Sequence, residues 1–133
     1  MLNLARKNHC VILNKSAQNM GMIHKVNDYV TWGEAKPETI TKLIEKRGRL
    51  TQGRKLTDDY VKENTKYKNV KEFALAVAES KSNLKELKDL KPVLRLNPPK
   101  GGFERGGIKK PYGKGGVLGY RGDKINELIA KML

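Results

Sequence analysis

Basic, aromatic and glycine residues are concentrated in one stretch of this sequence, residues 97–122, which we call the Gly-rich loop. It contains nine of the 13 glycines, three of the five prolines and three of the eight aromatic residues. It also carries six Lys or Arg residues against a single acid, Glu104. Positive charge, flat rings and a backbone free to follow an irregular groove favour binding to phosphates and stacking on bases. This stretch is therefore predicted to bind a nucleic acid.

Glycines beside a lysine also suggest the phosphate loop of a nucleotide-using enzyme. Gly113-Lys114-Gly115 has part of that pattern. However, the Ser or Thr required after the lysine is missing, and Gly107 lies one residue too far upstream. A dinucleotide-binding fingerprint needs a different glycine spacing, with a strand directly before it and a helix directly after it. A helix beginning after Gly119–Gly122 could still hold one phosphate. A small nucleotide-binding enzyme is therefore the alternative function.

Two other groups of residues could do chemistry. Cys10 with His9 and His24 contains the ligand types of a metal site. On a strand, however, His9 and Cys10 point to opposite faces, and a tetrahedral zinc site would need a fourth ligand. Cys10 is interpreted as a small core residue. Asp58 and Asp59 follow a predicted helix cap, where the helix dipole favours negative charge, so their role is interpreted as structural. The sequence predicts no catalytic residue, metal or cofactor.

The charge of the whole chain favours a polyanionic partner. The formal net charge is +14, from 28 basic and 14 acidic residues. Ten of the 14 acids lie within residues 34–89, so the middle is nearly balanced and both ends are basic. A second basic cluster contains Lys46, Arg47, Arg49, Arg54 and Lys55. Two clusters and the basic excess together predict nucleic-acid binding. RNA is preferred, because no recognition-helix signature of a DNA-binding dimer is present.

Hydropathy predicts no membrane partner. No unbroken apolar run is longer than six residues, which is too short for a signal peptide or a transmembrane span. The single cysteine cannot form an intrachain disulfide, which fits a reducing cytosol.

Apolar periodicity predicts an α+β body that positions these segments. Period-two alternation over residues 28–33 is typical of a strand, and short β-rich runs at 9–13 and 92–96 predict two more. Residues 1–7 are predicted to be the end of a helix, and 83–87 a turn. Caps and 3.6-residue periods predict further helices. These are 17–26 with Met20, Met22 and Ile23 toward a core, 37–48 with Ile40, Leu43 and Ile44, a short helix capped by Thr57, and one opened by Asn69 with Val70, Phe73, Ala74 and Val77.

A last helix at 123–132 has Ile125, Leu128, Ile129 and Met132 on one face. If this helix docks, the Gly-rich loop is held at both ends and is not a free tail. We expect it to become ordered mainly when its RNA is present. The predicted organisation is a body of residues 1–96, the Gly-rich loop of residues 97–122, and a C-terminal helix of residues 123–133 that packs back on the body.

Many short blocks, taken in order, resemble one known family. They are Asn8-His9-Cys10, Gly21-Met22, Asp28-Tyr29-Val30-Thr31-Trp32-Gly33, Lys46-Arg47-Gly48-Arg49, Leu56-Thr57-Asp58, Lys91-Pro92-Val93-Leu94-Arg95-Leu96, Pro98-Pro99, Gly119-Tyr120-Arg121-Gly122 and Ile125-Asn126. Together they resemble the family of large-subunit ribosomal protein L-thirty in its long archaeal form, which is related to the eukaryotic protein L-seven. The resemblance runs from Leu2 to Met132.

The resemblance implies a ferredoxin-like β-α-β-α-β core with added helices and a long basic loop. It also implies a structural constituent of the large (50S) ribosomal subunit in the cytoplasm. Such a protein binds and stabilises 23S rRNA, with 5S rRNA and neighbouring ribosomal proteins as further partners. It has no catalytic activity and no small-molecule substrate.

In one respect the sequence departs from the family. Its members begin with a strand, a basic loop and most of a helix before the position of Met1, and that strand is central in the family's sheet. We expect Met1 to be an internal methionine, with the start assigned too far downstream. A true truncation, compensated by the strand at 92–96 or by rRNA, is the alternative.

The predicted rRNA-binding residues combine the basic clusters with the aromatic rings of the loop. Cations would neutralise phosphates, and the rings would stack on bases or wedge against sugars. About six phosphate contacts predict that log K falls against log salt with a slope on the order of −4 to −5. A basic adaptor whose acid-balanced middle binds another protein is a third hypothesis. The predicted residues are Arg6, Lys7, Lys15, Arg47, Arg49, Arg54, Lys55, Lys100, Phe103, Arg105, Lys109, Lys110, Tyr112, Lys114, Tyr120 and Arg121.

Overall fold

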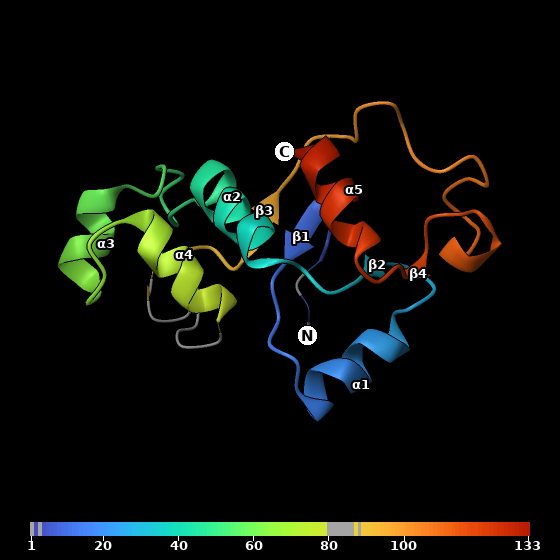
Figure 1. The fold of residues 1–133 in the computed structure, drawn as a ribbon, viewed down its shortest axis with the longest axis horizontal. Coiled ribbons are helices and arrows are strands. Elements are labelled where there is room, and N and C mark those ends of the chain that lie inside the picture. Colours follow the sequence, from blue (N-terminus) through green and yellow to red (C-terminus); the bar gives the residue numbers. More distant parts are fainter. Residues whose placement is uncertain (1, 3, 80–86, 88) are drawn as a thin grey trace.

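The computed structural model describes residues 2, 4–79, 87 and 89–133 (Figure 1). Helices and short strands alternate along the chain. In chain order they are β1 (His9–Val11), α1 (Ala17–Lys25), β2 (Thr31–Trp32), α2 (Pro37–Arg47), α3 (Asp58–Asn64), α4 (Val70–Ala78), β3 (Val93–Arg95), the 3-10 helix η2 (Tyr112–Lys114), β4 (Gly119–Tyr120) and α5 (Lys124–Met132).

The four named strands form two small sheets within the described residues. β1 pairs antiparallel with β3, with Cys10 opposite Leu94. β2 pairs parallel with β4, with Thr31 opposite Gly119. Helices combined with these small sheets confirm the α+β class and are consistent with the ferredoxin-like core.

Helix α2 lies at the centre of the molecule. Its first residue is Pro37, whose fixed φ and missing N–H suit that position. Its last turn ends where Gly48 N donates to the carbonyl of Ile44 (2.9 Å). Ile40 and Ile44 belong to one cluster of buried apolar side chains, whereas Leu43 belongs to a second. Because α2 contributes to both clusters, it joins the two halves of the core.

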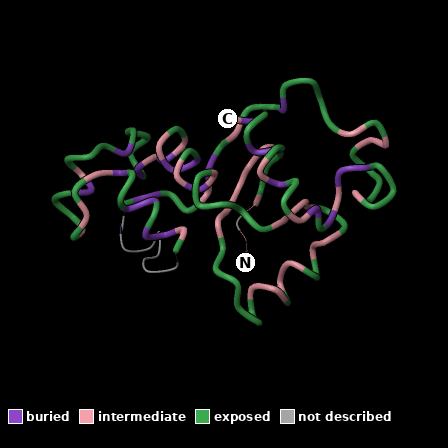
Figure 2. The backbone as a smooth tube through the Cα atoms, viewed as in Figure 1, coloured by how far each residue is buried: buried purple, intermediate pink, exposed green. Residues whose placement is uncertain are grey.

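The two clusters contain the apolar stripes predicted for α2, α4 and α5. The first is centred on α4, where Phe73 and Ala74 are fully buried, and it includes Val61 of α3. The second contains the apolar face of α5 together with Leu43 and Leu94. Figure 2 shows these buried positions in purple along α2, α4 and α5, whereas most of the Gly-rich loop is exposed.

Side-chain caps fix the starts of the helices in the first cluster. The Thr57 hydroxyl accepts a hydrogen bond from the backbone of α3 (3.3 Å), and Asn69 Oδ1 accepts one from Glu72 N (2.8 Å). Asp58 Oδ1 accepts a hydrogen bond from Val70 N (2.9 Å), so it links the starts of α3 and α4. The structural role predicted for Asp58 is confirmed.

The cap at Asn69 allows a direct test of helix α4. Asn69→Ala leaves an N–H group of the first turn without its acceptor, and we expect a loss of about 1 kcal/mol in the free energy of unfolding. Urea unfolding followed by circular dichroism measures this loss. Ser16→Ala is the matched control, because Ser16 caps α1, which has no buried residue. Equal losses in the two variants would contradict the packing of α4 at the core.

Two sequence predictions in the N-terminal part are wrong. Residues 4 and 5 have no regular secondary structure and residues 6–8 form a bend and turn, so this segment is not the end of a helix. Asn8, with φ 61°, turns the chain into β1. Met20, Met22 and Ile23 are only half-buried, because α1 lies away from both clusters (Figure 1). The turn predicted at 83–87 lies outside the described residues except for Leu87, which is buried.

Candidate nucleic-acid interface

The Gly-rich loop is held at both ends by backbone hydrogen bonds. Near its start, Asn97 N and Lys100 N donate to the last turn of α5, at 2.9 and 3.1 Å. Near its end, Gly119 N and Arg121 N donate to the carbonyl groups of the β2 segment, at 2.7 and 2.9 Å. In the structure the segment is therefore a closed loop on the body.

The middle of the Gly-rich loop folds on itself. η2 ends at Gly115, whose left-handed φ of 84° suits glycine. Gly106 N then donates to the carbonyl of Gly115 (2.9 Å). A Cβ atom on Gly106 would collide with that carbonyl, so the close approach of the two backbone segments requires glycine. The glycines thus serve a defined turn as well as flexibility.

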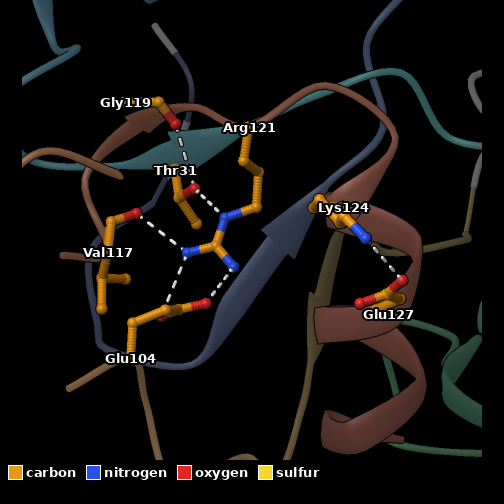
Figure 3. A network of polar contacts seen from close by, with 7 residues as sticks. All are labelled: Thr31, Glu104, Val117, Gly119, Arg121, Lys124 and Glu127. Atoms are coloured by element: carbon orange, nitrogen blue, oxygen red, sulfur yellow. Dashed lines mark hydrogen bonds and ion pairs between the residues drawn. The ribbon is translucent and has the colours of Figure 1, made fainter. Parts of the chain in front are cut away.

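Arg121 is the centre of the loop's polar contacts, although it was predicted to lie at the surface. It is 5% exposed. Its Nη1 lies 2.8 Å from Glu104 Oε1, and its Nη2 donates to the carbonyl of Val117 (3.0 Å). Its Nε donates to the hydroxyl of Thr31 (2.7 Å), which itself donates to the carbonyl of Gly119 (3.0 Å). Figure 3 shows these contacts converging on one guanidinium group from the loop and from β2.

The structure gives Arg121 a place different from the predicted phosphate contact. Its guanidinium is paired with the single acid of the Gly-rich loop and stacks on the ring of Tyr112, with its Cζ 4.7 Å from the ring centre. Buried cations are stable only when they are paired and hydrogen-bonded. We therefore replace the predicted role of Arg121 by a structural one, and one side of Tyr112 is likewise used within the loop.

Tyr120 joins the loop to β2 through its ring. The ring lies 4.5 Å from that of Trp32, centre to centre, at 43° between planes, and His24 contacts Trp32 edge-on at 6.1 Å. The Tyr120 hydroxyl donates to the carboxylate of Glu34, at 2.7 Å to its nearer oxygen, and this hydrogen bond raises the pKa of the phenol. Tyr120 remains 50% exposed, so one side stays accessible for stacking.

The outside of the Gly-rich loop carries exposed positive charge and two exposed apolar side chains. Phe103 is 41% exposed and Ile108 is 61% exposed. The loop's other cations form no salt bridge with a described residue. These exposed cations are Lys100, Arg105, Lys109, Lys110 and Lys114.

In the second predicted cluster, Lys46 and Arg47 lie in the last turn of α2, and the other three residues lie on a basic turn that follows it. The backbones of Arg49 and Lys55 form an antiparallel β-bridge across the turn, and Leu50 N donates to the carbonyl of Arg54 (2.8 Å). Gly53, with φ 79°, reverses the chain. In Figure 1 this turn, between α2 and α3, and the Gly-rich loop lie at opposite ends of the molecule. The structure thus separates the two clusters. Arg47 and Arg49 are half-buried, whereas Arg6, Lys7, Lys15, Arg54 and Lys55 are exposed.

Curated relatives match this chain over almost its whole length. It is 52% identical over 133 residues to the large ribosomal subunit protein uL30 of Methanopyrus kandleri, covering 100% of this chain and 89% of that protein. It is 50% identical to that of Archaeoglobus fulgidus over 132 residues, covering 99% and 85%. It is 45% identical to that of Methanosphaera stadtmanae over 133 residues, covering 100% and 86%. The chain belongs to the uL30 family. No protein-family model matches the chain.

Membership of the uL30 family confirms the resemblance to the L-thirty family. It argues against the alternative of a nucleotide-binding enzyme. uL30 proteins are structural components and not enzymes. In the structure, Gly113 and Lys114 belong to η2, which does not join a strand directly to an α-helix as a phosphate loop does.

Of the residues considered as metal ligands, His9 and Cys10 lie on β1, whereas His24 lies in α1. Burial raises the pKa of the Cys10 thiol to about 11, so it is protonated at neutral pH and is a weak nucleophile. Among the described residues, no group of three His, Cys, Asp or Glu side chains is arranged to hold a metal ion. Likewise, no described helix is sufficiently long and apolar to cross a membrane.

The residues that shape the Gly-rich loop of this uL30 chain were not predicted from the sequence. The sequence did contain a signal for Glu104, because it is the single acid in a basic segment and could be expected to pair with one of the cations. Thr31 and Val117 had none, since their role depends on the pairing of β2 with β4. Trp32 was read only as part of a strand, and its contact with Tyr120 depends on the same pairing.

Proposed function

We propose that this chain binds and stabilises 23S rRNA in the large (50S) ribosomal subunit through the exposed surface of the Gly-rich loop. A structural role in the large subunit follows from membership of the uL30 family. The contact with 23S rRNA, with 5S rRNA as a second partner, is our proposal. Neighbouring large-subunit proteins complete the expected partners.

One observation carries this proposal: the single acid of the Gly-rich loop is paired with Arg121, and the other cations of the loop are exposed to solvent. Glu104 is neutralised by Arg121, at 2.8 Å. Lysines and arginines around a pre-formed backbone neutralise phosphates without first having to order the chain. Phe103 and Tyr120 add rings for stacking. The basic turn containing Arg49, Arg54 and Lys55 is a second contact surface, with Arg6, Lys7, Lys15 and Arg47 as further candidates.

The salt dependence of binding tests the proposal. Because Arg121 is buried and is not counted as a phosphate contact, about five phosphate contacts remain in the Gly-rich loop. These five contacts are expected to contribute about −3.5 to −4.5 to the slope of log K against log salt. Lys109→Gln with Lys110→Gln removes two exposed charges and should reduce the magnitude of the slope by about 1.4 to 1.8. Binding of the purified chain to large-subunit rRNA fragments across a salt series measures the total slope, which should be at least this steep, and its change in the double variant.

A matched control uses two exposed lysines outside the proposed interface. Lys62→Gln with Lys71→Gln removes the same charge from α3 and α4. This variant should lower the slope far less than the loop variant. If the two double variants change the slope equally, net charge and not the Gly-rich loop governs binding. If the wild-type chain shows a flat salt response and does not sediment with 50S particles, the adaptor hypothesis is favoured.

A further inference from the structure

A hollow of about 160 Å³ lies between the start of the Gly-rich loop and α5. The loop contributes Gly101–Glu104, Tyr112 and Arg121 to its wall. Helix α5 contributes Lys124, Glu127 and Lys131. The α5 residues were not among the predicted RNA-binding residues. The hollow therefore joins part of the proposed interface to a helix face that no role yet explains.

An exposed ring forms the apolar part of this hollow. Phe103 is 41% exposed, and the buried Leu128 lines the same hollow. A large ring left partly in water at the edge of a charged hollow offers a flat surface to a partner. Bases stack on such rings whatever their sequence, because every base has a π-face.

The charges around the hollow leave an excess of positive charge. Glu104 is paired with Arg121 (2.8 Å), and Glu127 is paired with Lys124 (3.2 Å), as Figure 3 shows. Lys131 forms no salt bridge with a described residue. Lys100 is brought next to it, because Lys100 N donates to the carbonyl of Lys131 (3.1 Å). Lys131 thus lines the hollow with no salt-bridge partner among the described residues, and a second lysine is joined to it through the backbone.

We propose that this hollow receives one unpaired nucleotide of large-subunit rRNA, with its base stacked on Phe103 and a phosphate beside Lys131. The proposal rests on the rRNA-binding function proposed above. An apolar peptide side chain does not fit, because it would remove water from the charged groups of the wall without replacing their hydrogen bonds. A base within a duplex does not fit either, because both of its faces are already stacked. Unpaired bases in loops and bulges expose a face for aromatic stacking.

Phe103 and Ile108 provide a matched pair of variants. Both are exposed apolar residues of the same loop, and only Phe103 lines the hollow. We expect Phe103→Ala to weaken binding to a large-subunit rRNA fragment between about 5-fold and 160-fold, the range for loss of one base–aromatic stack. The salt slope should not change, because no charge is removed. Ile108→Ala should bind like the wild type, and Phe103→Trp should retain the affinity.

Two further measurements locate the nucleotide. Lys131→Gln should reduce the magnitude of the salt slope by about 0.7 to 0.9, the value for one phosphate contact. Irradiation of the wild-type complex at 254 nm, a wavelength absorbed by bases, should yield a nucleotide adduct on the peptide that contains Phe103, as identified by mass spectrometry.

The outcomes separate this proposal from the one on which it rests. A steep wild-type salt slope with equal affinities for Phe103→Ala and Ile108→Ala overturns the nucleotide site and leaves rRNA binding intact. A flat wild-type slope overturns rRNA binding itself. If reconstituted large subunits yield a crosslink from Phe103 to a neighbouring protein and none to rRNA, the hollow is a protein contact and the nucleotide site is overturned.

Discussion

Arg121→Ala is expected to weaken rRNA binding by at least about tenfold while leaving the salt slope nearly unchanged. The variant removes the partner of Glu104 and the donors to Thr31 and Val117, all of which lie within 3.0 Å of the guanidinium. Leaving such groups unpaired costs about 1–3 kcal/mol each when they are buried. Because Glu104 has a side chain that is 30% exposed, water can partly replace Arg121 there. The loop then loses its fixed shape, and binding has to include the cost of ordering it.

Arg105→Ala is the matched control, since Arg105 is an exposed arginine of the same loop. It should reduce the magnitude of the salt slope by about 0.7 to 0.9 and leave the loop's structure intact. Amide hydrogen exchange at Gly106 and Val117, whose N–H groups donate within the loop, distinguishes the two variants. Exchange should accelerate in Arg121→Ala only. If Arg121→Ala instead keeps the protection of these amides and lowers the slope like Arg105→Ala, Arg121 is a phosphate ligand and not a structural residue.

Phe73→Ala is expected to cause the largest loss of global stability, about 3–5 kcal/mol. Phe73 is 0% exposed in the first core cluster, and its ring contacts that of Tyr67 at 6.0 Å between centres. The substitution loses the transfer free energy of the ring and leaves a cavity. Since small domains are stable by only about 5–15 kcal/mol, the variant should unfold at much lower urea concentration.

Leu75→Ala on the same helix gives the comparison for Phe73. Leu75 is 45% exposed, so its truncation should change the free energy of unfolding by about 0.5 kcal/mol or less. Urea unfolding of both variants, followed by circular dichroism, measures the difference. Comparable losses would show that α4 does not pack through the face that contains Phe73.

Local sequence signals were sufficient for most of the helices. Pro37 and Gly48 mark the limits of α2, and the caps Thr57 and Asn69 mark the starts of α3 and α4. These signals work because a helix start needs a side-chain acceptor within a few residues. Helix α1 shows where this reasoning ends. Its apolar period predicts a face but not whether another element covers that face.

The interface was less predictable because its geometry depends on contacts between distant residues. Exposed lysines such as Lys109 and Lys110 could be predicted from composition alone. The burial of Arg121 could not be predicted, since a basic residue between glycines is usually exposed. Its contact with Thr31 arises only in the tertiary structure. Separation of the basic turn around Arg54 from the Gly-rich loop is also a consequence of tertiary structure, because charge counts carry no information about distance.

The pairing of β2 with β4 has a consequence for the order in which the chain acquires its binding surface. Thr31 and Gly119 are 88 residues apart, and Arg121 reaches Thr31 across 90. Contacts at such separation form late, because the entropy of closing a long segment is lost before the contact is gained. During synthesis, Arg121 emerges only with the last part of the chain. A chain released before that point carries most of the basic residues but lacks the partner of Glu104. It would bind RNA through its positive charge without the fixed conformation of the Gly-rich loop.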